Sequence, residues 1–357
     1  MANQYSSLKI FHHKEALDAI HDGKKIAPFY IRIKPTNICN HHCSYCTYGA
    51  GDIQNQTLNR DLVKRTDTIP WDKMQEIIRD IGDMGVKAVT FSGGGEPLTY
   101  PKIVDAVQML KDRNIDISLI SNGQLLKGKI AELFYDAKWV RISFDSPHEA
   151  EYMKLRNVST EAFHMVCDNI KIFAENKAKN CVLGINFVIS KANYNRVYEA
   201  AALLKNFGVN NIKFAAVLDN QIDYHINIKD TVMAQIHRAQ QELSSEEFSI
   251  INNYENDWMD KNFKVQQFPH CYTCKLVTVI AADSKVYYCH TRAYDSKAIL
   301  GDLSNISFKK MWFSDETTKK LENLNPKQDC KNFCVYEERN QLIQSYFDVD
   351  YDHINFI

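Results

Sequence analysis

The chain has 357 residues, of which 45% are hydrophobic, and its formal net charge is -1. This length allows one large domain, or one domain with a smaller companion, around a sizeable core. The near-neutral charge provides no basic field that would attract nucleic acid or an anionic membrane, so we expect neither as a partner. The N-terminus has no apolar signal core, and no later run reaches the roughly 18 apolar residues of a membrane span. We therefore expect a cytoplasmic protein.

Residues 1–27 are a polar lead-in, with one short amphipathic segment at 14–21 that we expect to be helical. Three closely spaced cysteines follow, with the pattern Cys39-x3-Cys43-x2-Cys46. Three thiolates at this spacing can bind three corners of a 4Fe-4S cluster and leave the fourth iron open. A structural zinc site is the alternative, with His41 or His42 as the fourth ligand.

This stretch resembles the signature of the radical S-adenosylmethionine (radical SAM) superfamily, and Tyr45, directly before the last cysteine, fits the signature too. The resemblance implies that the open iron binds SAM. It also implies that one electron cleaves SAM to a 5'-deoxyadenosyl radical, so the cofactors carry the difficult chemistry. The electron would come from an external donor of the flavodoxin or ferredoxin type.

From residue 28 to about 247, strand-like runs alternate with helix-like segments, which predicts an α/β fold with a parallel sheet and right-handed crossovers. The strand-like runs are 30–33, 88–91, 117–120, 140–144, 183–189 and 212–217. The helix-like segments are 71–84, 103–113, 128–136, 160–178, 195–207 and 231–243. Six such units resemble the partial (β/α)6 TIM barrel of the superfamily, in which functional groups lie at the carboxyl ends of the strands.

A glycine-rich turn follows the second strand-like run. Gly93, Gly94 and Gly95 let the backbone approach a ligand closely. In radical SAM proteins the matching stretch holds the amino group of SAM, so the resemblance assigns these glycines and Glu96 to that role. An ordinary turn before the next helix is the alternative.

Later strand-like runs add further candidates for the SAM pocket. Ser121 and Asn122 either form hydrogen bonds at its rim or cap the next helix. By resemblance, Ser143 contacts the SAM ribose and Arg156 binds the SAM carboxylate, a task that suits a bidentate arginine. A surface position is the alternative for Arg156, and Asn186 is a further candidate from the fifth run.

Two other features stand outside these motifs. Residues 49–69 form a long polar stretch. We expect it either to lie over or beside the active site or to be a solvent-exposed loop. Cys167 and Cys181 stand alone, and we expect both to pack in apolar surroundings.

Residues 248–357 carry a second cysteine group, Cys271-x2-Cys274-x14-Cys289 followed by Cys330-x3-Cys334. A predicted hairpin with its turn at 283–284 precedes the third of these cysteines. The arrangement resembles the twitch and SPASM extensions of radical SAM enzymes, so we expect a smaller cysteine-rich α+β domain with one auxiliary 4Fe-4S cluster. Four cysteines suffice for it, and either of the first two is spare. A structural zinc site is the alternative.

These features predict a radical SAM enzyme that abstracts hydrogen from a small polar substrate, such as a sugar, an aminocyclitol or a nucleotide-linked metabolite, with oxidation or epimerisation as the outcome. We favour a small substrate because residues 1–27 leave no room for the leader-binding domain of many peptide-modifying relatives. Modification of a ribosomally made peptide is the runner-up, and a non-catalytic iron-sulfur or zinc scaffold is the alternative from another class. Candidates for acid-base chemistry are Tyr48, Tyr224, His225 and Cys289, and the sequence singles out none.

Overall fold

The computed structural model describes residues 6–49, 58–217, 222–254, 266, 268–330 and 334–356. In this part of the chain, ten strands form one sheet in the order β10-β9-β8-β1-β2-β3-β4-β5-β6-β7. Strands β1 to β7 are parallel to their neighbours. The sheet is open, because its edge strands β10 and β7 do not pair with each other. This arrangement confirms the predicted α/β class and partial barrel.

All six predicted strands are present, with bounds within one residue of the expected ones. They are β1 (Tyr30–Ile33), β2 (Ala88–Phe91), β3 (Asp116–Ser121), β4 (Trp139–Ser143), β5 (Val182–Ile189) and β6 (Asn211–Ala216). The structure adds a seventh parallel strand, β7 (Ser249–Asn252). We did not predict it, because its apolar part consists only of Ile250 and Ile251.

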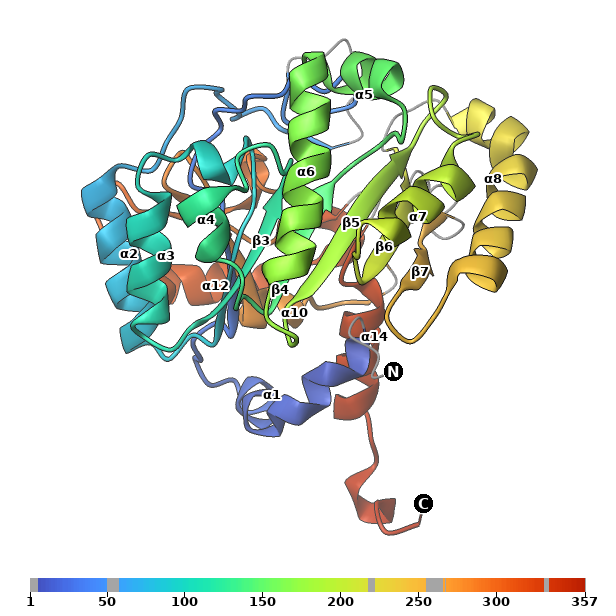
Figure 1. Ribbon diagram of the computed structural model, residues 1–357. Helices are drawn as coiled ribbons and strands as arrows, with labels where there is room; N and C mark the ends of the chain where they lie inside the picture. Colours follow the sequence, from blue (N-terminus) through green and yellow to red (C-terminus); the bar gives the residue numbers. More distant parts are fainter. Residues whose placement is uncertain are drawn as a thin grey trace.

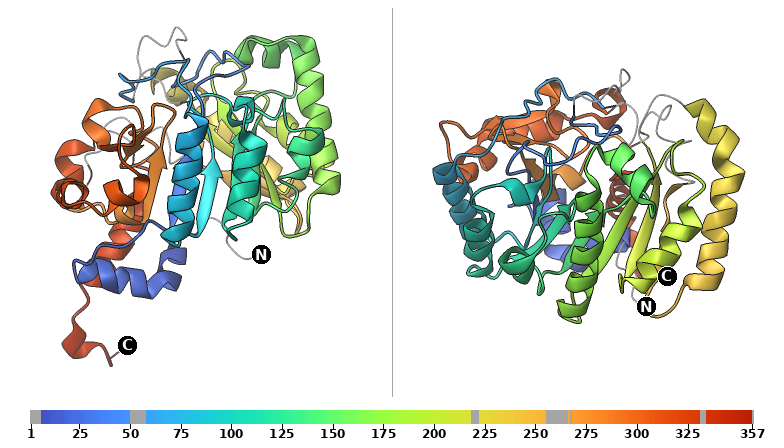
Figure 2. Two further views of the ribbon diagram at one scale, coloured as in Figure 1. Left: turned by 90° about the vertical axis from the view of Figure 1, so that its left-hand side faces the viewer. Right: turned by 45° about the horizontal axis from the view of Figure 1, so that its top comes forward.

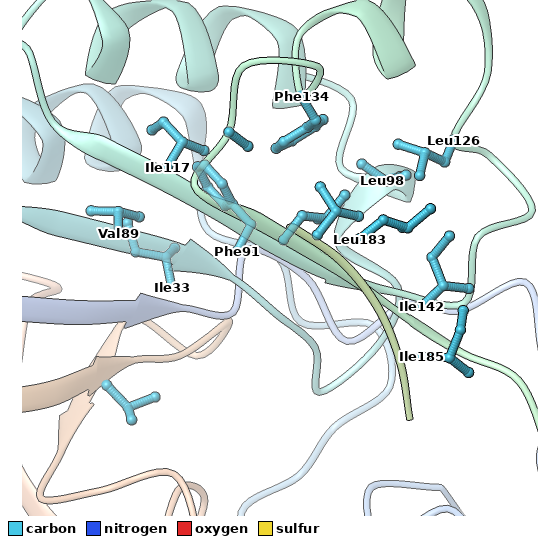
Figure 3. Close-up of a cluster of buried hydrophobic side chains, with 14 of the residues drawn as sticks. Ile33, Val89, Phe91, Leu98, Ile117, Leu126, Phe134, Ile142, Leu183 and Ile185 are labelled. Atoms are coloured by element: carbon cyan, nitrogen blue, oxygen red, sulfur yellow. The ribbon is translucent and has the colours of Figure 1, made fainter. Parts of the chain in front are cut away.

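Helices cover the outer face of the parallel strands (Figure 1). They are α2 (Trp71–Asp83), α3 (Ile103–Lys111), α4 (Gly128–Glu132), α5 (Glu149–Arg156), α6 (Thr160–Asn176), α7 (Val197–Asn206) and α8 (Ile222–Leu243). In α2, Met74, Ile77, Ile78 and Ile81 recur at helical spacing, and all four are fully buried. They join a core that includes the outward-facing apolar side chains of the strands, among them Ile33, Phe91 and Ile142 (Figure 3).

The inner face of the strands is polar. Along β4, buried Val140 and Ile142 alternate with half-buried Arg141 and Ser143, because successive side chains point to opposite faces of a sheet. The same alternation places Arg32 of β1, Asn186 of β5 and Lys213 of β6 on the inner face. Ser143, Asn186 and Lys213 lie in register on adjacent strands. The strands therefore enclose a polar lumen.

The C-terminal part of the chain joins the same sheet through β8 (Val277–Ile280), which is parallel to β1. An antiparallel strand, β9 (Lys285–Tyr287), follows a turn in which Ser284 has φ 60°, and β10 (Ile299–Asp302) pairs with β9. The predicted hairpin is thus present, with serine in a conformation that usually favours glycine. The sheet continues on both edges beyond residue 247, the expected domain boundary.

Helices complete this part, and the last of them contacts the N-terminal lead-in. They are α10 (Thr273–Leu276), α11 (Phe308–Trp312), α12 (Asp315–Asn323), α13 (Pro326–Asp329) and α14 (Glu337–Phe347). Leu17 and Ile20 of α1 (Lys14–His21) share a small apolar cluster with Ile343 of α14, and the two helices lie side by side (Figures 1 and 2). Beyond α14 the tail leads away from the barrel, and its residues 352–356 are exposed.

Among the described residues, no helix is both long enough and apolar enough to cross a membrane.

Candidate active site

A cavity of about 1070 Å³ occupies the lumen and opens at the carboxyl ends of the parallel strands. Most of the predicted site residues line it: Cys39, Cys43, Tyr45, Cys46, Gly93, Gly94, Gly95, Glu96, Ser121, Asn122, Ser143, Arg156, Asn186 and Cys334. The first cysteine group lies at one end, in the loop after β1. Cys334 and the first turn of α14 lie at the other end. The structure therefore brings the first cysteine group and Cys334 of the second group to one cavity.

The end of α5 holds the loop that carries the first cysteine group. The backbone N–H of His42 donates to the carbonyl of Arg156 at 3.0 Å, and that of Ser44 donates to the carbonyl of Leu155 at 2.9 Å. These carbonyls are free to accept, because the last carbonyls of a helix have no partner within it. The helix C-terminus thus fixes the loop on both sides of Cys43.

The glycine turn after β2 holds the same loop from the other side. The N–H groups of Gly95 and Glu96 donate to the carbonyls of Thr36 and Ile38 at 3.1 and 2.9 Å. A Cβ at Gly95 would meet the Ile38 carbonyl oxygen at 2.2 Å, and one at Gly94 would meet Asn37 Oδ1 at 2.0 Å. Close approach of the cysteine loop therefore demands these glycines.

Glu96 is a buried carboxylate held by hydrogen bonds. It accepts from the N–H groups of Leu98 at 3.0 Å and Asn122 at 2.7 Å, and from the Ser121 hydroxyl at 2.9 Å. Burial nevertheless raises the pKa of Glu96 to about 7. A positively charged amino group is the partner that such a carboxyl group fits.

Ser121 and Asn122 orient neighbouring side chains and do not cap α4, whose N-cap is Lys127. The Asn122 amide donates to Asn40 Oδ1 at 2.8 Å and accepts from the N–H of Gln124 at 3.0 Å. These bonds connect the end of β3 to the cysteine loop.

Arg156 is 2% exposed, so its predicted alternative as a surface charge is wrong. Its guanidinium forms a buried ion pair with Asp145, which also accepts a hydrogen bond from the Tyr45 hydroxyl. The second carboxylate oxygen of Asp145 accepts from the N–H of Val188 at 2.9 Å. Arg156 Nε is buried without a partner among the described residues, so this donor can serve an anionic group in the cavity. Asp145 is a site residue that sequence reasoning did not assign.

The first three thiols fit an iron-sulfur cluster. All three are free and half-buried, and burial raises the pKa of Cys39 to about 11 and also raises that of Cys43. Buried thiolates need a cationic partner, which the irons of a cluster provide. Within the described ranges, no three His, Cys, Asp or Glu side chains are arranged around a single ion. A 4Fe-4S cluster does not need such an arrangement, because each thiolate binds a different iron.

The five thiols of the second group lie near the amino end of β1, below the lumen. Burial raises the pKa of Cys330 to about 12, and the neighbouring Cys289 and Cys271 raise it further. Burial also raises the pKa of Cys334, to which Cys271, Cys289 and Cys330 contribute. Cys271 and Cys289 also raise the pKa of Cys274, so all five thiols belong to one group. Cys274 is fully buried in the apolar core, and its thiol donates to the Cys271 carbonyl at 2.8 Å.

Two histidines next to cysteines of the second group occupy different places. His290 lines the cavity and lies 3.4 Å from the Tyr336 hydroxyl, whereas His270 is exposed. Asn340 of α14 accepts from the N–H and hydroxyl of Thr273, each at 2.9 Å. This contact fixes the turn that carries Cys271.

Residues 50–57 of the long polar stretch at 49–69 lie outside the described residues. Its described part, 58–69, packs beside the cavity. Leu62 donates to the Tyr294 carbonyl at 3.0 Å, and Arg65 lines the cavity. The predicted position beside the active site therefore holds for this part.

Tyr48 is the acid-base candidate that lies in the cavity with cations around it. Lys34 Nζ donates to its hydroxyl at 3.0 Å, and the Arg60 guanidinium stacks 4.2 Å from its ring centroid. Burial would raise the pKa of Tyr48, but Arg60 and Lys34 lower it overall. Tyr224 and His225 are buried on α8, where His225 lies 3.1 Å from the Tyr254 hydroxyl.

Cys167 and Cys181 are 7% and 1% exposed and belong to the main apolar core, as predicted.

An open (β/α)6 sheet with a three-cysteine loop at its carboxyl end defines the class of radical SAM proteins. Residues 33–204 match the model of the radical SAM superfamily, so this part of the chain is a radical SAM domain. Such domains bind a 4Fe-4S cluster and SAM.

Several known proteins resemble this chain. It is 30% identical over 163 residues to a GTP 3',8-cyclase of Clostridium perfringens, which covers 45% of this chain and 46% of the cyclase. It is 25% identical over 236 residues to the radical SAM cyclopropyl synthase TigE of Paramaledivibacter caminithermalis, which covers 62% of this chain and 48% of the synthase. The chain thus spans about half the length of these curated relatives.

Solved structures share the fold at low sequence identity. SuiB of Streptococcus suis, bound to the precursor peptide SuiA, has a TM-score of 0.61 at 16% identity and covers 91% of this chain and 73% of SuiB. Native anSMEcpe with bound AdoMet has a TM-score of 0.61 at 15% identity and covers 90% of this chain and 97% of anSMEcpe.

Proposed function

We propose that this protein is a radical SAM enzyme that removes a hydrogen atom from a small polar substrate and catalyses its oxidation or epimerisation. Bound together, the cluster and SAM supply reductive cleavage of a carbon–sulfur bond and transfer of one hydrogen atom from the substrate to the adenosyl carbon. This chain's residues hold the reactants. Cys39, Cys43 and Cys46 bind the cluster, Glu96 receives the SAM amino group, and Arg156 receives the SAM carboxylate.

The observation that supports the proposal best is the cavity that the first cysteine group shares with Cys334 of the second group. A substrate in this lumen lies between the SAM site and the second group, so an auxiliary cluster there can accept an electron. Ser143, Asn186 and Lys213 offer polar contacts at adjacent register positions. The name of the cyclase relative supports a small substrate, since it refers to GTP.

Anaerobic incubation with SAM and dithionite tests the first step. We expect formation of 5'-deoxyadenosine by the reconstituted parent and none above background with Cys43→Ala. A Cys167→Ala variant is the matched control, because that thiol is buried in the core outside both groups. Equal yields of 5'-deoxyadenosine from the parent and Cys43→Ala would contradict the enzyme proposal and favour a non-catalytic scaffold protein.

For the second group, we propose that Cys271, Cys289, Cys330 and Cys334 bind the auxiliary cluster and that Cys274 is spare. The complete burial of Cys274 and the hydrogen bond of its thiol to the Cys271 carbonyl support this assignment. We expect about eight irons per reconstituted chain. Cys274→Ala should retain about eight and Cys271→Ala about four. Retention of one zinc per chain in place of the second set of irons would instead establish a structural zinc site.

Peptide modification is the second candidate, because SuiB, of the same fold, was solved with its precursor peptide. Substrate trials in deuterated buffer separate the outcomes. An epimerised small molecule would gain one deuteron from solvent, an oxidised one would lose two hydrogens, and a modified peptide would overturn the small-substrate proposal. We also propose that an external donor of the flavodoxin or ferredoxin type supplies the electron that cleaves SAM.

A further inference from the structure

Tyr294 has an unusual backbone conformation. Its φ is 67°, in the left-handed region that a bulky residue seldom adopts. The other non-glycine residues with positive φ in the described ranges are Asn114, Asn157 and Ser284, which are small and polar. Holding a tyrosine in this conformation costs free energy that the surrounding contacts must offset, and such residues concentrate at functional sites. The contacts of Tyr294 therefore indicate what the conformation serves.

The side chain of Tyr294 is fully buried, and its hydroxyl joins two distant parts of the chain. It accepts from the N–H of Ala282, in the turn between β8 and β9, at 3.2 Å, and it donates to Asn37 Oδ1 at 2.5 Å. The ring packs edge-on against Tyr48 and also beside Tyr287, with centroids 5.9 and 5.8 Å away. These contacts fix the position of the hydroxyl.

Asn37 is held at both ends of its carboxamide. Its Nδ2 donates to the Lys64 carbonyl at 2.8 Å, which leaves Oδ1 facing the Tyr294 hydroxyl. Its backbone N–H donates to the Asp67 carbonyl at 2.9 Å. Asn37 is 4% exposed and lines the cavity, and Tyr294 supports it from the buried side. The carboxamide is therefore a fixed part of the cavity wall.

The glycine turn lies against this pair of side chains. A Cβ at Gly94 would meet Asn37 Oδ1 at 2.0 Å and Tyr294 Oη at 2.8 Å, so the backbone of Gly94 contacts the hydrogen bond itself. Without the hydroxyl, Asn37 Oδ1 would be a buried acceptor that has lost its donor, and the carboxamide would turn to find another. The turn would then lose the surface that fixes its position.

We propose that Tyr294 is a positioning residue of the SAM site and acts through Asn37 on the glycine turn at Gly94. This inference rests on the proposed function, which places the SAM amino group at Glu96, two residues after Gly94. Tyr294 lies between β9 and β10, so the C-terminal part of the chain contributes to SAM binding in the barrel. The hydroxyl acts on the affinity for SAM through the shape of the pocket and takes no part in the chemistry.

SAM binding to the reconstituted protein under anaerobic conditions tests this proposal. Calorimetry measures the Kd for SAM, and iron per chain is determined on the same samples. Tyr294→Phe removes only the hydroxyl, and we expect it to raise the Kd about tenfold with iron unchanged, the order expected when a buried acceptor loses its donor. Tyr287→Phe is the matched control, because its hydroxyl belongs to the same group of rings but donates to Asp283 Oδ2, at 2.6 Å. The Kd of this control should stay within about twofold of that of the parent.

A double variant distinguishes this role from a general loss of stability. Asn37→Ala alone should raise the Kd for SAM by at least as much as Tyr294→Phe does. Because Tyr294 acts through Asn37, Tyr294→Phe/Asn37→Ala should bind SAM no more weakly than Asn37→Ala. Two independent contributions would instead give additive losses.

Four outcomes overturn the proposal. The Kd of Tyr294→Phe could lie within about twofold of that of the parent, or Tyr287→Phe could raise the Kd equally. The losses in the double variant could be additive. Tyr294→Phe could lose iron, which would assign its hydroxyl to assembly of the cluster. A parent that binds SAM retains the proposed function and with any of these results loses only this inference, whereas a parent that binds no SAM loses both.

Discussion

At the scale of single residues, Glu96 shows how burial and hydrogen bonding compete. Three donors favour its charged form, but burial dominates and raises the pKa to about 7 from the usual 4.5. The folded state therefore binds a proton more tightly than the unfolded state does. Its free energy of unfolding should fall as pH rises from about 4.5 to about 7.

We expect Glu96→Gln to remove this dependence in the metal-free protein. Relative to the parent, the variant should gain roughly 3 kcal/mol of stability between pH 5 and pH 8, because a shift of one pKa unit corresponds to about 1.4 kcal/mol. Urea unfolding at four pH values measures the difference. Glu132→Gln, at an exposed position, should follow the parent, and parallel curves for Glu96→Gln and the parent would contradict the prediction.

The Asp145–Arg156 pair gives a second prediction. Asp145→Asn leaves the Arg156 guanidinium buried without its counter-charge and should cost about 3–5 kcal/mol. Glu151→Gln breaks the half-buried pair between Glu151 and Arg196 and should cost about 1 kcal/mol or less. Urea denaturation at pH 7 measures the free energy of unfolding of both variants. Similar decreases in the two variants would show that the buried pair contributes no more to stability than the half-buried pair.

Sequence reasoning identified the residues whose roles follow from local spacing. The cysteines of the first group and the glycines after β2 needed only their neighbours in the chain. Asp145, Arg60 and Lys213 were missed, because their roles arise where distant segments meet. For Asp145 and Lys213 the alternation along β4 and β6 was the available signal, since it placed polar side chains on the inner face of apolar strands, whereas no local pattern marks Arg60.

At the scale of elements, the contact between the glycine turn and the cysteine loop makes a sharp prediction. In Gly95→Ala, the added Cβ would collide with the backbone at Asn37 and Ile38. The loop must move to relieve the collision, so the first cluster should be lost while iron at the second group remains. Iron per chain should fall by about four.

Gly128→Ala is the matched control for this substitution. Gly128 has φ 53° and no atom within 4 Å of an added Cβ, so alanine there costs only backbone strain of about 1–2 kcal/mol. Its iron content should equal that of the parent. An unchanged iron content in Gly95→Ala would mean that the turn does not hold the loop.

The predicted elements with strong periodicity were confirmed, and the weakly patterned ones were missed. Helix α2 has a clear apolar stripe and a glycine at its end. Helix α5 was not predicted as an element, because only two of its apolar side chains, Tyr152 and Leu155, are buried. Its position is set by contacts of its C-terminus with the cysteine loop, which no local pattern reveals.

At the scale of the whole molecule, the β8–β1 pairing merges the C-terminal part with the barrel. Buried residues from both parts, such as Ile31 and Phe308, belong to one core cluster. We therefore expect a single cooperative unfolding transition for the reduced, metal-free chain.

Tryptophan fluorescence can follow the two parts separately. In a Trp258→Phe background, a Trp312→Phe variant reports on Trp71 and Trp139 in the barrel, and a Trp71→Phe/Trp139→Phe variant retains Trp312 in α11. Their midpoints in urea should agree with midpoints from circular dichroism of the same variants. Distinct midpoints for the two regions within one variant would mean that the parts unfold separately.

The topology of the sheet was only half predictable. Order along the parallel strands follows from the βα repeat, whereas the attachment of β8 to the free edge of β1 joins residues nearly 250 positions apart. Hydrophobic pattern identifies a hairpin but does not say which edge it extends. Only the unpaired side of β1, seen in three dimensions, explains the choice.

The pairing of β8 with β1 also fixes the distance between the two cysteine groups. Cys39 follows the carboxyl end of β1, while Cys289 follows β9 back to the level of its amino end. The four residues of β1 span about 13 Å at roughly 3.3 Å per residue. Because an extended strand cannot shorten, the spacing of the two sulfur groups is set by the backbone and does not respond to the occupant of the lumen. Any electron that passes between them crosses a gap of fixed width, so its rate should depend on the driving force and hardly at all on the shape of the substrate.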